Sequence, residues 1–359
     1  MTDRDRGVEA ASSAVDKGGA MRIMIVAPPW LPVPPPAYGG TEAVLDGLAR
    51  GLRAAGHDVL LYTTGESTCE VERAFVFERA IGVGQGGAAQ EIRQVVHAYE
   101  MAGGFDVVHD HTLIGPLYSE RFPRVRVVTT NHGPFESDLI DLYRIVADRV
   151  PVIAISRHQA ATAGDLPIAA VIHHGVEPSE FPVGDGSGGY ALFLGRMNPT
   201  KGAHVAAAVA RKAGIPLRIA GKCQEKLEID YVETVIKPLL GSDVEYLGEV
   251  DHAAKLELLG RATVLLNPIS WPEPFGMVMI ESLACGTPVV TTPFGAAPEI
   301  VDDGVTGFVR DGEQALVDAV VRVGEIDRWR CRAAVEGHFS LRRMVDEHVD
   351  LFRRVIDRG

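Results

Sequence analysis

The sequence predicts an α/β protein built from two doubly wound domains that face each other across a cleft. Three observations lead to this fold class. The chain has 359 residues, about twice the length of a common domain. Short apolar runs alternate with helix-periodic segments over almost the whole length, which is typical of parallel sheets covered by helices. Residues 181–190, rich in glycine and proline, interrupt this alternation and are typical of a linker between two halves.

The first half carries five apolar runs that we expect to be strands. They are short, rich in valine and isoleucine, and apolar on both faces, as strands of a buried parallel sheet must be. These runs are residues 22–28, 58–63, 106–109, 125–130 and 152–156. Residues 42–55 and 88–102 have apolar positions spaced as on one face of a helix. We therefore assign residues 21–184 to an N-terminal doubly wound domain.

The same alternation starts again after the linker. Five further runs have the length and composition of buried strands. They are residues 191–195, 217–221, 244–248, 263–267 and 288–292. We assign residues 185–340 to a second doubly wound domain, and residues 341–359 to a charged, amphipathic helix that packs back on the first. Ligands of such sheets bind beyond the carboxyl ends of the strands, so the cleft between the domains is the expected site.

Targeting signals are not evident in the sequence. Residues 1–20 lack the apolar core of a secretory signal, so we expect a flexible leader, and Met21 could be the true starting residue. No segment reaches the ~20 apolar residues that cross a bilayer. The four cysteines are far apart, which fits a reduced compartment and argues against a zinc site. We expect a cytoplasmic protein that contacts the inner membrane face at most peripherally.

The acidic charge balance restricts the class of partner. A formal net charge of −13 gives no general attraction for nucleic acid or anionic lipid. Arg121, Arg124 and Arg126 form a local basic cluster that could contact a membrane, with a solvated surface as the commoner explanation. An anionic substrate must therefore be bound by a local site.

One candidate for such a site is the turn that follows the predicted strand 191–195. Arg196 and Lys201 stand in this turn, and we expect a helix to begin near Thr200. A helix start directs free amides at the cleft, and an arginine with a lysine suits a diphosphate. The alternative is a solvated loop with two surface charges.

A second candidate follows the predicted strand 263–267. Glu273 and Glu281 are eight residues apart, but the proline after Glu273 places this residue in a loop, with a helix beginning near Phe275. The amides that would face the cleft belong to Phe275, Gly276 and Met277. Carboxylates beside such amides can accept hydrogen bonds from sugar hydroxyls. The alternative is an acidic helix start that only complements the helix dipole.

A pair of glycines follows the proline-rich loop after the first strand. Gly39 and Gly40 let a ligand approach the backbone closely, and Thr41 is positioned to cap the helix that begins at Glu42. Such a pair is often only a turn.

Three histidines stand at the ends of predicted strands. His109 and His111 share one face of a strand and could bind a metal, but no third ligand is spaced for it, so we expect none. His132 precedes a glycine turn at the edge of the cleft and is better placed to contact substrate hydroxyls. A purely structural role is the alternative for His109 and His111.

In this order, the motifs resemble those of the family 4 retaining glycosyltransferases of the GT-B fold, the superfamily of glycogen synthases and phosphatidylinositol mannosyltransferases. The resemblance extends from about Met21 to the C-terminus. Its most specific parts are the motif at 195–202, the two glutamates, and residues 284–290 with the glycines that follow. It implies two Rossmann-like domains, the first for the acceptor and the second for a nucleotide-sugar donor.

The resemblance also implies roles for residues of the second domain. Arg196 and Lys201 would contact the donor diphosphate and stabilise the leaving group. Glu281 would bind the ribose hydroxyls. Glu273 would bind the donor sugar, together with the amides of Phe275, Gly276 and Met277.

Two residues of the first domain are implicated in the same way. Gly40 would approach the donor phosphates through its amide, and His132 would lie near the reacting sugar. One position departs from the family pattern, because His174 stands where the family usually has asparagine.

These inferences predict a retaining, metal-independent hexosyltransferase with no cofactor. The donor would be a UDP-, GDP- or ADP-hexose and the acceptor a hydroxyl-bearing small molecule, glycan or lipid. We expect same-face attack assisted by the leaving diphosphate, with His132, Glu273, Arg196 and Lys201 at the reacting centre. The alternatives are a nucleotide-sugar epimerase of similar architecture and a non-catalytic nucleotide-sugar-binding protein. The sequence leaves the base, the sugar and the acceptor open.

Overall fold

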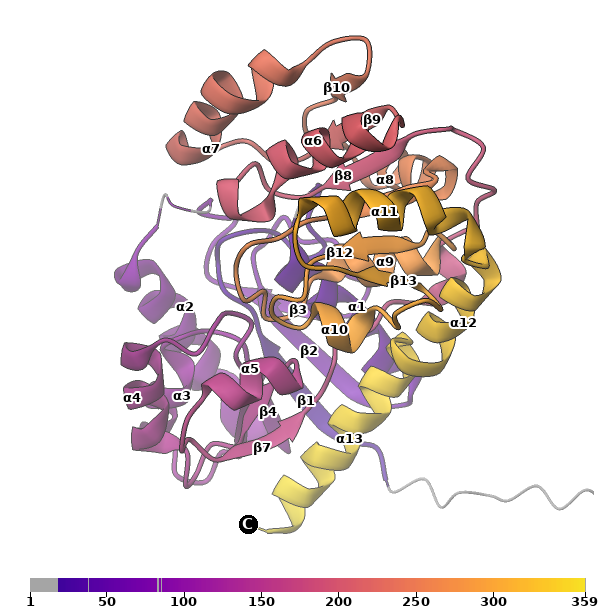
Figure 1. Cartoon of the computed structure of the whole chain (residues 1–359). Helices are drawn as coiled ribbons and strands as arrows, with labels where there is room; N and C mark the ends of the chain where they lie inside the picture. The colour runs from indigo at the N-terminus through magenta and orange to yellow at the C-terminus, as the bar shows by residue number, and fades with distance from the viewer. Residues whose placement is uncertain (1–18, 38, 83, 85, 359) are drawn as a thin grey trace, which may run out of the picture.

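The computed structural model describes residues 19–37, 39–82, 84 and 86–358. It contains two parallel sheets, each covered by helices, one above the other in Figure 1. The predicted fold class, two doubly wound units in one chain, is therefore confirmed. Most of the expected leader, residues 1–18, lies outside the described residues.

The sheet of the N-terminal half has seven parallel strands among the described residues, in the order β3-β2-β1-β4-β5-β6-β7. Their bounds are Arg22–Val26 (β1), Asp58–Thr63 (β2), Glu72–Phe75 (β3), Val107–Asp110 (β4), Val127–Thr130 (β5), Val152–Ala154 (β6) and Ile168–Val171 (β7). The apolar runs of the sequence predict five of them. The other two, β3 and β7, are the edge strands, and their partly exposed residues give no continuous apolar run.

Both faces of this sheet are buried, because alternate residues of one strand pack on different helices. Ile23 and Ile25 belong to a core with α1 and α13, whereas Met24 and Val26 belong to a core with α2. The helices of this half are α1 (Gly40–Ala54), α2 (Ala88–Met101), α3 (Gly115–Tyr118), α4 (Ser137–Val146) and α5 (Arg157–Thr162).

In the C-terminal half, the described residues form a six-stranded parallel sheet in the order β10-β9-β8-β11-β12-β13. Its strands are Ala191–Leu194 (β8), Leu217–Ala220 (β9), Val244–Tyr246 (β10), Val264–Asn267 (β11), Val289–Thr291 (β12) and Gly307–Val309 (β13). Only the short edge strand β13 is missing from the sequence prediction. The helices are α6 (Ala203–Ala213), α7 (Lys226–Tyr231), α8 (His252–Arg261), α9 (Met277–Ala284), α10 (Ala297–Ile300), α11 (Glu313–Arg322) and α12 (Arg328–His338).

Short helical turns complete the described secondary structure. The 3₁₀ turns are Ala102–Gly104, Ser119–Arg121, Pro178–Glu180, Pro199–Lys201 (η4), Lys237–Leu239 and Val323–Glu325, and Val232–Ile236 is π-helical. The segment 181–190 between the two halves contains neither helix nor strand. It is held against the second half, because the Arg328 guanidinium donates to the carbonyls of Gly184 and Ala262.

The last helix, α13 (Leu341–Asp357), leaves the C-terminal half and packs beside α1 of the N-terminal half (Figure 1). The close approach requires glycine, because a Cβ at Gly51 would lie 2.5 Å from Cγ2 of Val345. The apolar side of α13, which includes Met344 and Phe352, completes the core on that face of the first sheet.

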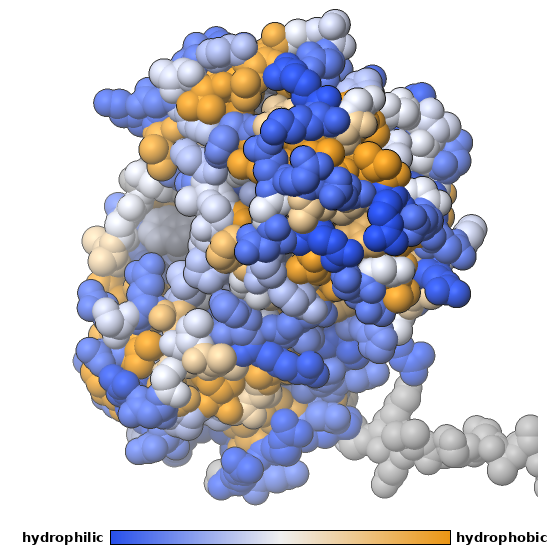
Figure 2. All heavy atoms as spheres, in the orientation of Figure 1, coloured by the Kyte–Doolittle hydropathy of each residue, from blue (hydrophilic) through white to orange (hydrophobic). Residues whose placement is uncertain are grey.

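The surface in the view of Figure 2 is mainly hydrophilic, with hydrophobic atoms in small separate patches. None of the helices in the described part of the chain is long and apolar enough to cross a membrane.

Candidate active site

A cavity of about 800 Å³ lies between the two halves and is lined by residues of both. It is bounded by loops at the carboxyl ends of the parallel strands, where doubly wound sheets bind ligands. Every residue that the sequence predicts for the site contributes to its lining: Gly40, His132, Arg196, Lys201, Glu273, Phe275, Gly276, Met277 and Glu281. These residues come from segments far apart in the sequence, so the fold brings them together.

Lys201 forms an ion pair with Glu273 in this cavity. Lys201 ends the turn η4, and Glu273 lies in the loop between β11 and α9. The two side chains are only 17% and 14% exposed, and the Lys201 ammonium also lies 5.1 Å from the centre of the Trp271 ring. The pair is therefore held in a water-poor part of the cleft, where electrostatic interactions are strong.

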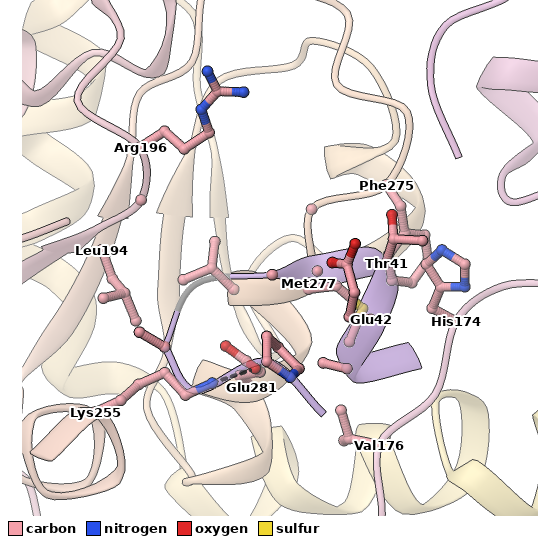
Figure 3. A pocket seen from close by; sticks show the side chains of 18 of the residues that line it. Thr41, Glu42, His174, Val176, Leu194, Arg196, Lys255, Phe275, Met277 and Glu281 are labelled. Atoms are coloured by element: carbon pink, nitrogen blue, oxygen red, sulfur yellow. Dashed lines mark hydrogen bonds and ion pairs between the residues drawn. The ribbon is translucent and has the colours of Figure 1, made fainter. Parts of the chain in front are cut away.

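Glu281 forms a second ion pair in the same cavity, with Lys255 of α8 at 2.6 Å (Figure 3). Glu281 lies on α9, about one turn after the helix begins at Met277. Lys255 belongs to no motif of the sequence and is not among the predicted site residues. Its position beside Glu281 depends on the packing of α8 against α9.

Arg196 is held differently from the two lysines. Its Nε donates to Glu228 at 2.8 Å and its Nη2 to Glu225 at 3.0 Å, both from the start of α7. Burial alone would raise the pKa of Glu228, but the amides of Gln224 and Glu225 and the Arg196 guanidinium bring it below its ordinary value. In Figure 3 the guanidinium points away from the Lys255–Glu281 pair. The guanidinium thus lines the cleft while two of its donor nitrogens bind α7 carboxylates.

The helix starts at this site differ from those that we predict from the sequence. In place of a helix beginning near Thr200, the chain forms the 3₁₀ turn η4, and α6 begins at Ala203. Helix α9 begins at Met277 rather than near Phe275, because Gly276 has a φ of +100° and cannot be helical. Of the three amides that the sequence predicts for this helix start, only that of Met277 therefore belongs to the first turn of α9.

The first turn of α1 also lines the cleft. Helix α1 begins at Gly40, so Thr41 lies inside it and makes no capping hydrogen bond, contrary to the prediction. A Cβ at Gly40 would lie 3.9 Å from Cγ of Met277, which places this turn against the start of α9. Glu42, in the same turn, is only 6% exposed and faces the cavity (Figure 3).

Five histidines form a continuous row from the cleft to α13. Nδ1 of His111 lies 2.8 Å from Nε2 of His132, and the rings of His132 and His174 stack with their centroids 5.3 Å apart. On the other side, His109 packs on His111 and on His348. We call these five residues the histidine row.

Burial lowers the pKa of every member of the histidine row, for His132 and His348 to about 4, so the imidazoles are neutral near pH 7. Nδ1 of His132 is buried without a hydrogen-bond partner in the described structure. In that same part of the chain no group of three histidine, cysteine or acidic side chains is placed to hold a metal.

Two further residues line the cleft although the sequence motifs do not predict them for the site: Glu42 and Lys222. Lys222 is 5% exposed and follows β9 after one glycine. Its place at the carboxyl end of a predicted strand is the signal that could have identified it. Glu42 stands two residues after the glycine pair, at a helix start that is itself predicted.

Comparisons with known proteins agree with this geometry. The family model described as Glycosyltransferase Family 4 matches residues 38–180, and the one described as Glycosyl transferases group 1 matches residues 183–332. The phosphatidyl-myo-inositol mannosyltransferase of Mycolicibacterium smegmatis is 28% identical over 345 residues, which cover 86% of this chain and 86% of that enzyme. The glycogen synthase of Mycobacterium tuberculosis is 35% identical over 154 residues, which cover 40% of this chain and 36% of that enzyme.

Solved structures give the same assignment. AviGT4, a glycosyltransferase involved in avilamycin A biosynthesis, is 26% identical with a TM-score of 0.71, over 94% of this chain and 99% of that one. HepE of Anabaena in complex with UDP-glucose has the same fold, with a TM-score of 0.73 at 17% identity, over 93% of this chain and 100% of that one. The protein is therefore a glycosyltransferase, and the chain belongs to family 4 of these enzymes, with their GT-B fold.

Proposed function

We propose that this glycosyltransferase moves a hexose from a nucleotide-diphosphate hexose to a hydroxyl group of an acceptor, with retention of configuration and without a metal ion. The two partly buried ion pairs of the cleft, Lys201–Glu273 and Lys255–Glu281, carry this proposal. Each pair presents a cation and a carboxylate to one cavity. Phosphate oxygens can accept hydrogen bonds from the lysines, and sugar hydroxyls can donate to the carboxylates.

Cleavage of a glycosyl–phosphate bond develops positive charge on the sugar and negative charge on the diphosphate. The Lys201 ammonium and the Met277 amide at the start of α9 are fixed donors that stabilise the leaving diphosphate without rearrangement. Arg196 adds its guanidinium at the end of β8. Fixed cations of this kind can replace a divalent metal at the leaving group.

The carboxylates and His132 position the sugar and the nucleoside. Glu273 accepts hydrogen bonds from hydroxyls of the donor sugar, and Glu281 from the ribose hydroxyls. The neutral imidazole of His132 has a buried Nδ1 without a partner among the described residues, which is available to a sugar hydroxyl. Because Glu273 has the role of a hydroxyl ligand, the acceptor attacks from the face of the leaving diphosphate, which takes up the acceptor proton.

The relatives support a nucleotide-sugar donor and a hydroxyl acceptor. HepE is known in complex with UDP-glucose, and the mycobacterial relatives are named as transferring mannose to phosphatidyl-myo-inositol. We infer a UDP-, GDP- or ADP-hexose as donor and a small molecule, glycan or lipid as acceptor. The expected location is the cytoplasm, with peripheral membrane contact where the acceptor is a lipid.

A donor screen followed by product analysis tests the proposal. Melting temperatures are measured with UDP-, GDP- and ADP-hexoses, since a ligand of the folded state raises them. The stabilising donor is then incubated with sugar, inositol and phosphatidylinositol acceptors in excess EDTA, and the product is examined by ¹H NMR. We expect a glycoside with the anomeric configuration of the donor.

Three outcomes would contradict separate parts of the proposal. An inverted product excludes retention, and loss of turnover in EDTA excludes metal independence. Isomerisation of the donor without acceptor identifies an epimerase instead. The Lys201→Ala variant is the matched control, because its donor turnover should fall while the fold is kept.

A further inference from the structure

Lys222 is a buried lysine of the cleft to which the sequence motifs assign no role. It lies in the loop after β9, and the backbone amide of Met197 donates to its carbonyl at 2.9 Å. This bond places Lys222 directly beside the turn that carries Arg196, because β8 and β9 are neighbouring parallel strands. Lys222 and Arg196 therefore reach the cavity from adjacent strand ends.

The charge of Lys222 lacks the direct partner that the other cleft cations have. Lys201 contacts Glu273, Lys255 contacts Glu281, and Arg196 contacts two carboxylates of α7. Within the described residues, no carboxylate lies within 4.0 Å of the Lys222 ammonium and no acceptor within hydrogen-bond distance of it, although the residue is only 5% exposed.

The charge that faces Lys222 belongs to Glu42, on the opposite wall of the cleft. Glu42 is 6% exposed and projects from the first turn of α1 (Figure 3). Burial raises the pKa of Glu42, and the positive charge of Lys222 opposes that rise. The two groups attract each other across the cavity without forming an ion pair. The Lys222 side chain lines the cavity, so its ammonium is available to an anionic ligand there.

We propose that Lys222 binds the diphosphate of the donor, as a third cation beside Lys201 and Arg196. This assignment rests on the proposed function. An ammonium is a compact donor-only charge that suits phosphate oxygens. Two donor nitrogens of Arg196 are bound to the carboxylates of Glu228 and Glu225, which reduces the positive charge that Arg196 offers to a ligand. Lys222, at the end of the neighbouring strand, adds a second positive charge to the same side of the cavity. In the free protein only the more distant charge of Glu42 acts on Lys222, whereas the donor diphosphate would contact its ammonium directly.

Isothermal titration calorimetry with UDP, GDP and ADP tests the assignment. For the nucleoside diphosphate that binds, the affinity of its nucleoside is also measured, in a competition titration. In Lys222→Met, which keeps the length of the side chain, we expect the diphosphate affinity to fall about tenfold or more and the nucleoside affinity to stay unchanged. Lys222→Arg should retain most of the affinity. The control Lys212→Met changes an exposed lysine of α6 outside the cleft and should bind as the unaltered chain does.

Stability separates a binding role from a structural one. Without ligand, Lys222→Met should melt at the same temperature as the unaltered chain or higher, because its ammonium has no ion pair or hydrogen bond within the described residues to lose. A lower melting temperature in both Lys222→Met and Lys222→Gln would assign Lys222 to the fold and overturn the proposal. Unchanged diphosphate affinity would overturn it too, as would an equal loss for nucleoside and diphosphate. If the unaltered chain binds none of the three diphosphates, the proposed function itself fails, and this assignment with it.

Discussion

Glu299 and His173 join the two halves of the molecule beside the cleft, because the Glu299 carboxylate lies 2.8 Å from Nε2 of His173. Glu299 belongs to α10 of the C-terminal half, and His173 follows β7 of the N-terminal half. The same carboxylate accepts hydrogen bonds from the amides of Arg157 and His158, in the first turn of α5. One nearly buried side chain therefore satisfies three donors of the opposite half.

Replacement of Glu299 by alanine should destabilise the protein by about 1–3 kcal/mol, because partly buried donors lose their acceptor. Urea denaturation at pH 7 measures the change. Glu233→Ala is the control, because Glu233 forms an exposed ion pair with Lys237, four residues later in the chain. This substitution should change the free energy of unfolding by less than about 0.5 kcal/mol. Equal effects of the two substitutions would contradict the role of Glu299.

The contribution of Glu299 should also depend on pH. Burial alone would raise its pKa, but the His173 side chain and the two amides bring the pKa below the ordinary value of 4.5. A carboxyl with a depressed pKa contributes stability above its ordinary pKa and loses it as the pH falls through the depressed value. The difference between the unaltered chain and Glu299→Ala should therefore be full at pH 7 and shrink below pH 4.5.

The histidine row should make the protein sensitive to mild acid. Its members are neutral in the folded state because burial lowers their pKa, whereas in the unfolded chain they bind protons near pH 6.5. Above that pH neither state is protonated, so stability is unaffected. Below it the unfolded state binds more protons, and each such histidine lowers the free energy of unfolding by up to about 1.4 kcal/mol per pH unit.

Urea denaturation between pH 7.5 and 4.5 measures this dependence, and a variant of His348 isolates one member of the row. The His348 side chain hydrogen-bonds the carbonyl of Met344, and its pKa is lowered to about 4. His348→Gln keeps a donor but cannot titrate, so the slope below pH 6.5 should decrease by about 1.4 kcal/mol per pH unit. An unchanged slope would mean that His348 is not neutral in the folded state.

Most of the fold could be predicted because buried parallel strands are apolar on both faces. In β1, Ile23 and Ile25 face one layer of helices, while Met24 and Val26 face the other, so the run has no polar interruption. Edge strands lack this signal. β3 reads Glu-Arg-Ala-Phe with most residues exposed, and it is a strand only because β2 lies beside it.

The sequence predicts those site residues that stand in a motif directly after a predicted strand. Arg196 and Glu281 belong to such motifs, but their partners come from elsewhere in the chain. Glu228 lies 32 residues after Arg196, and Lys255 lies 26 residues before Glu281. These pairings depend on how α7 and α8 pack, which local sequence patterns do not contain.

The contact between α1 and α13 offers a direct test of the packing. Gly51→Ala gains up to about 1 kcal/mol of helix propensity. Its Cβ, however, would meet the stiff Val345 side chain at 2.5 Å, so we expect a net loss of about 1–3 kcal/mol in unfolding free energy. Gly47→Ala is the matched control, because its Cβ would lie 3.4 Å from Cδ1 of Leu341 and is better tolerated. Equal stability of the two variants would mean that α13 can shift freely.

Glu281 should distinguish the nucleoside from the diphosphate. If its carboxylate binds the ribose hydroxyls, Glu281→Ala should weaken nucleoside diphosphate binding about tenfold, since two hydrogen bonds to a charged group are lost. Inorganic diphosphate lacks a ribose and should bind at least as well as before. The substitution also removes the partner of Lys255, which leaves an extra positive charge in the cleft. Isothermal titration with both ligands decides the matter: equal losses would place Glu281 at the phosphates, and no loss for either would remove it from the donor site.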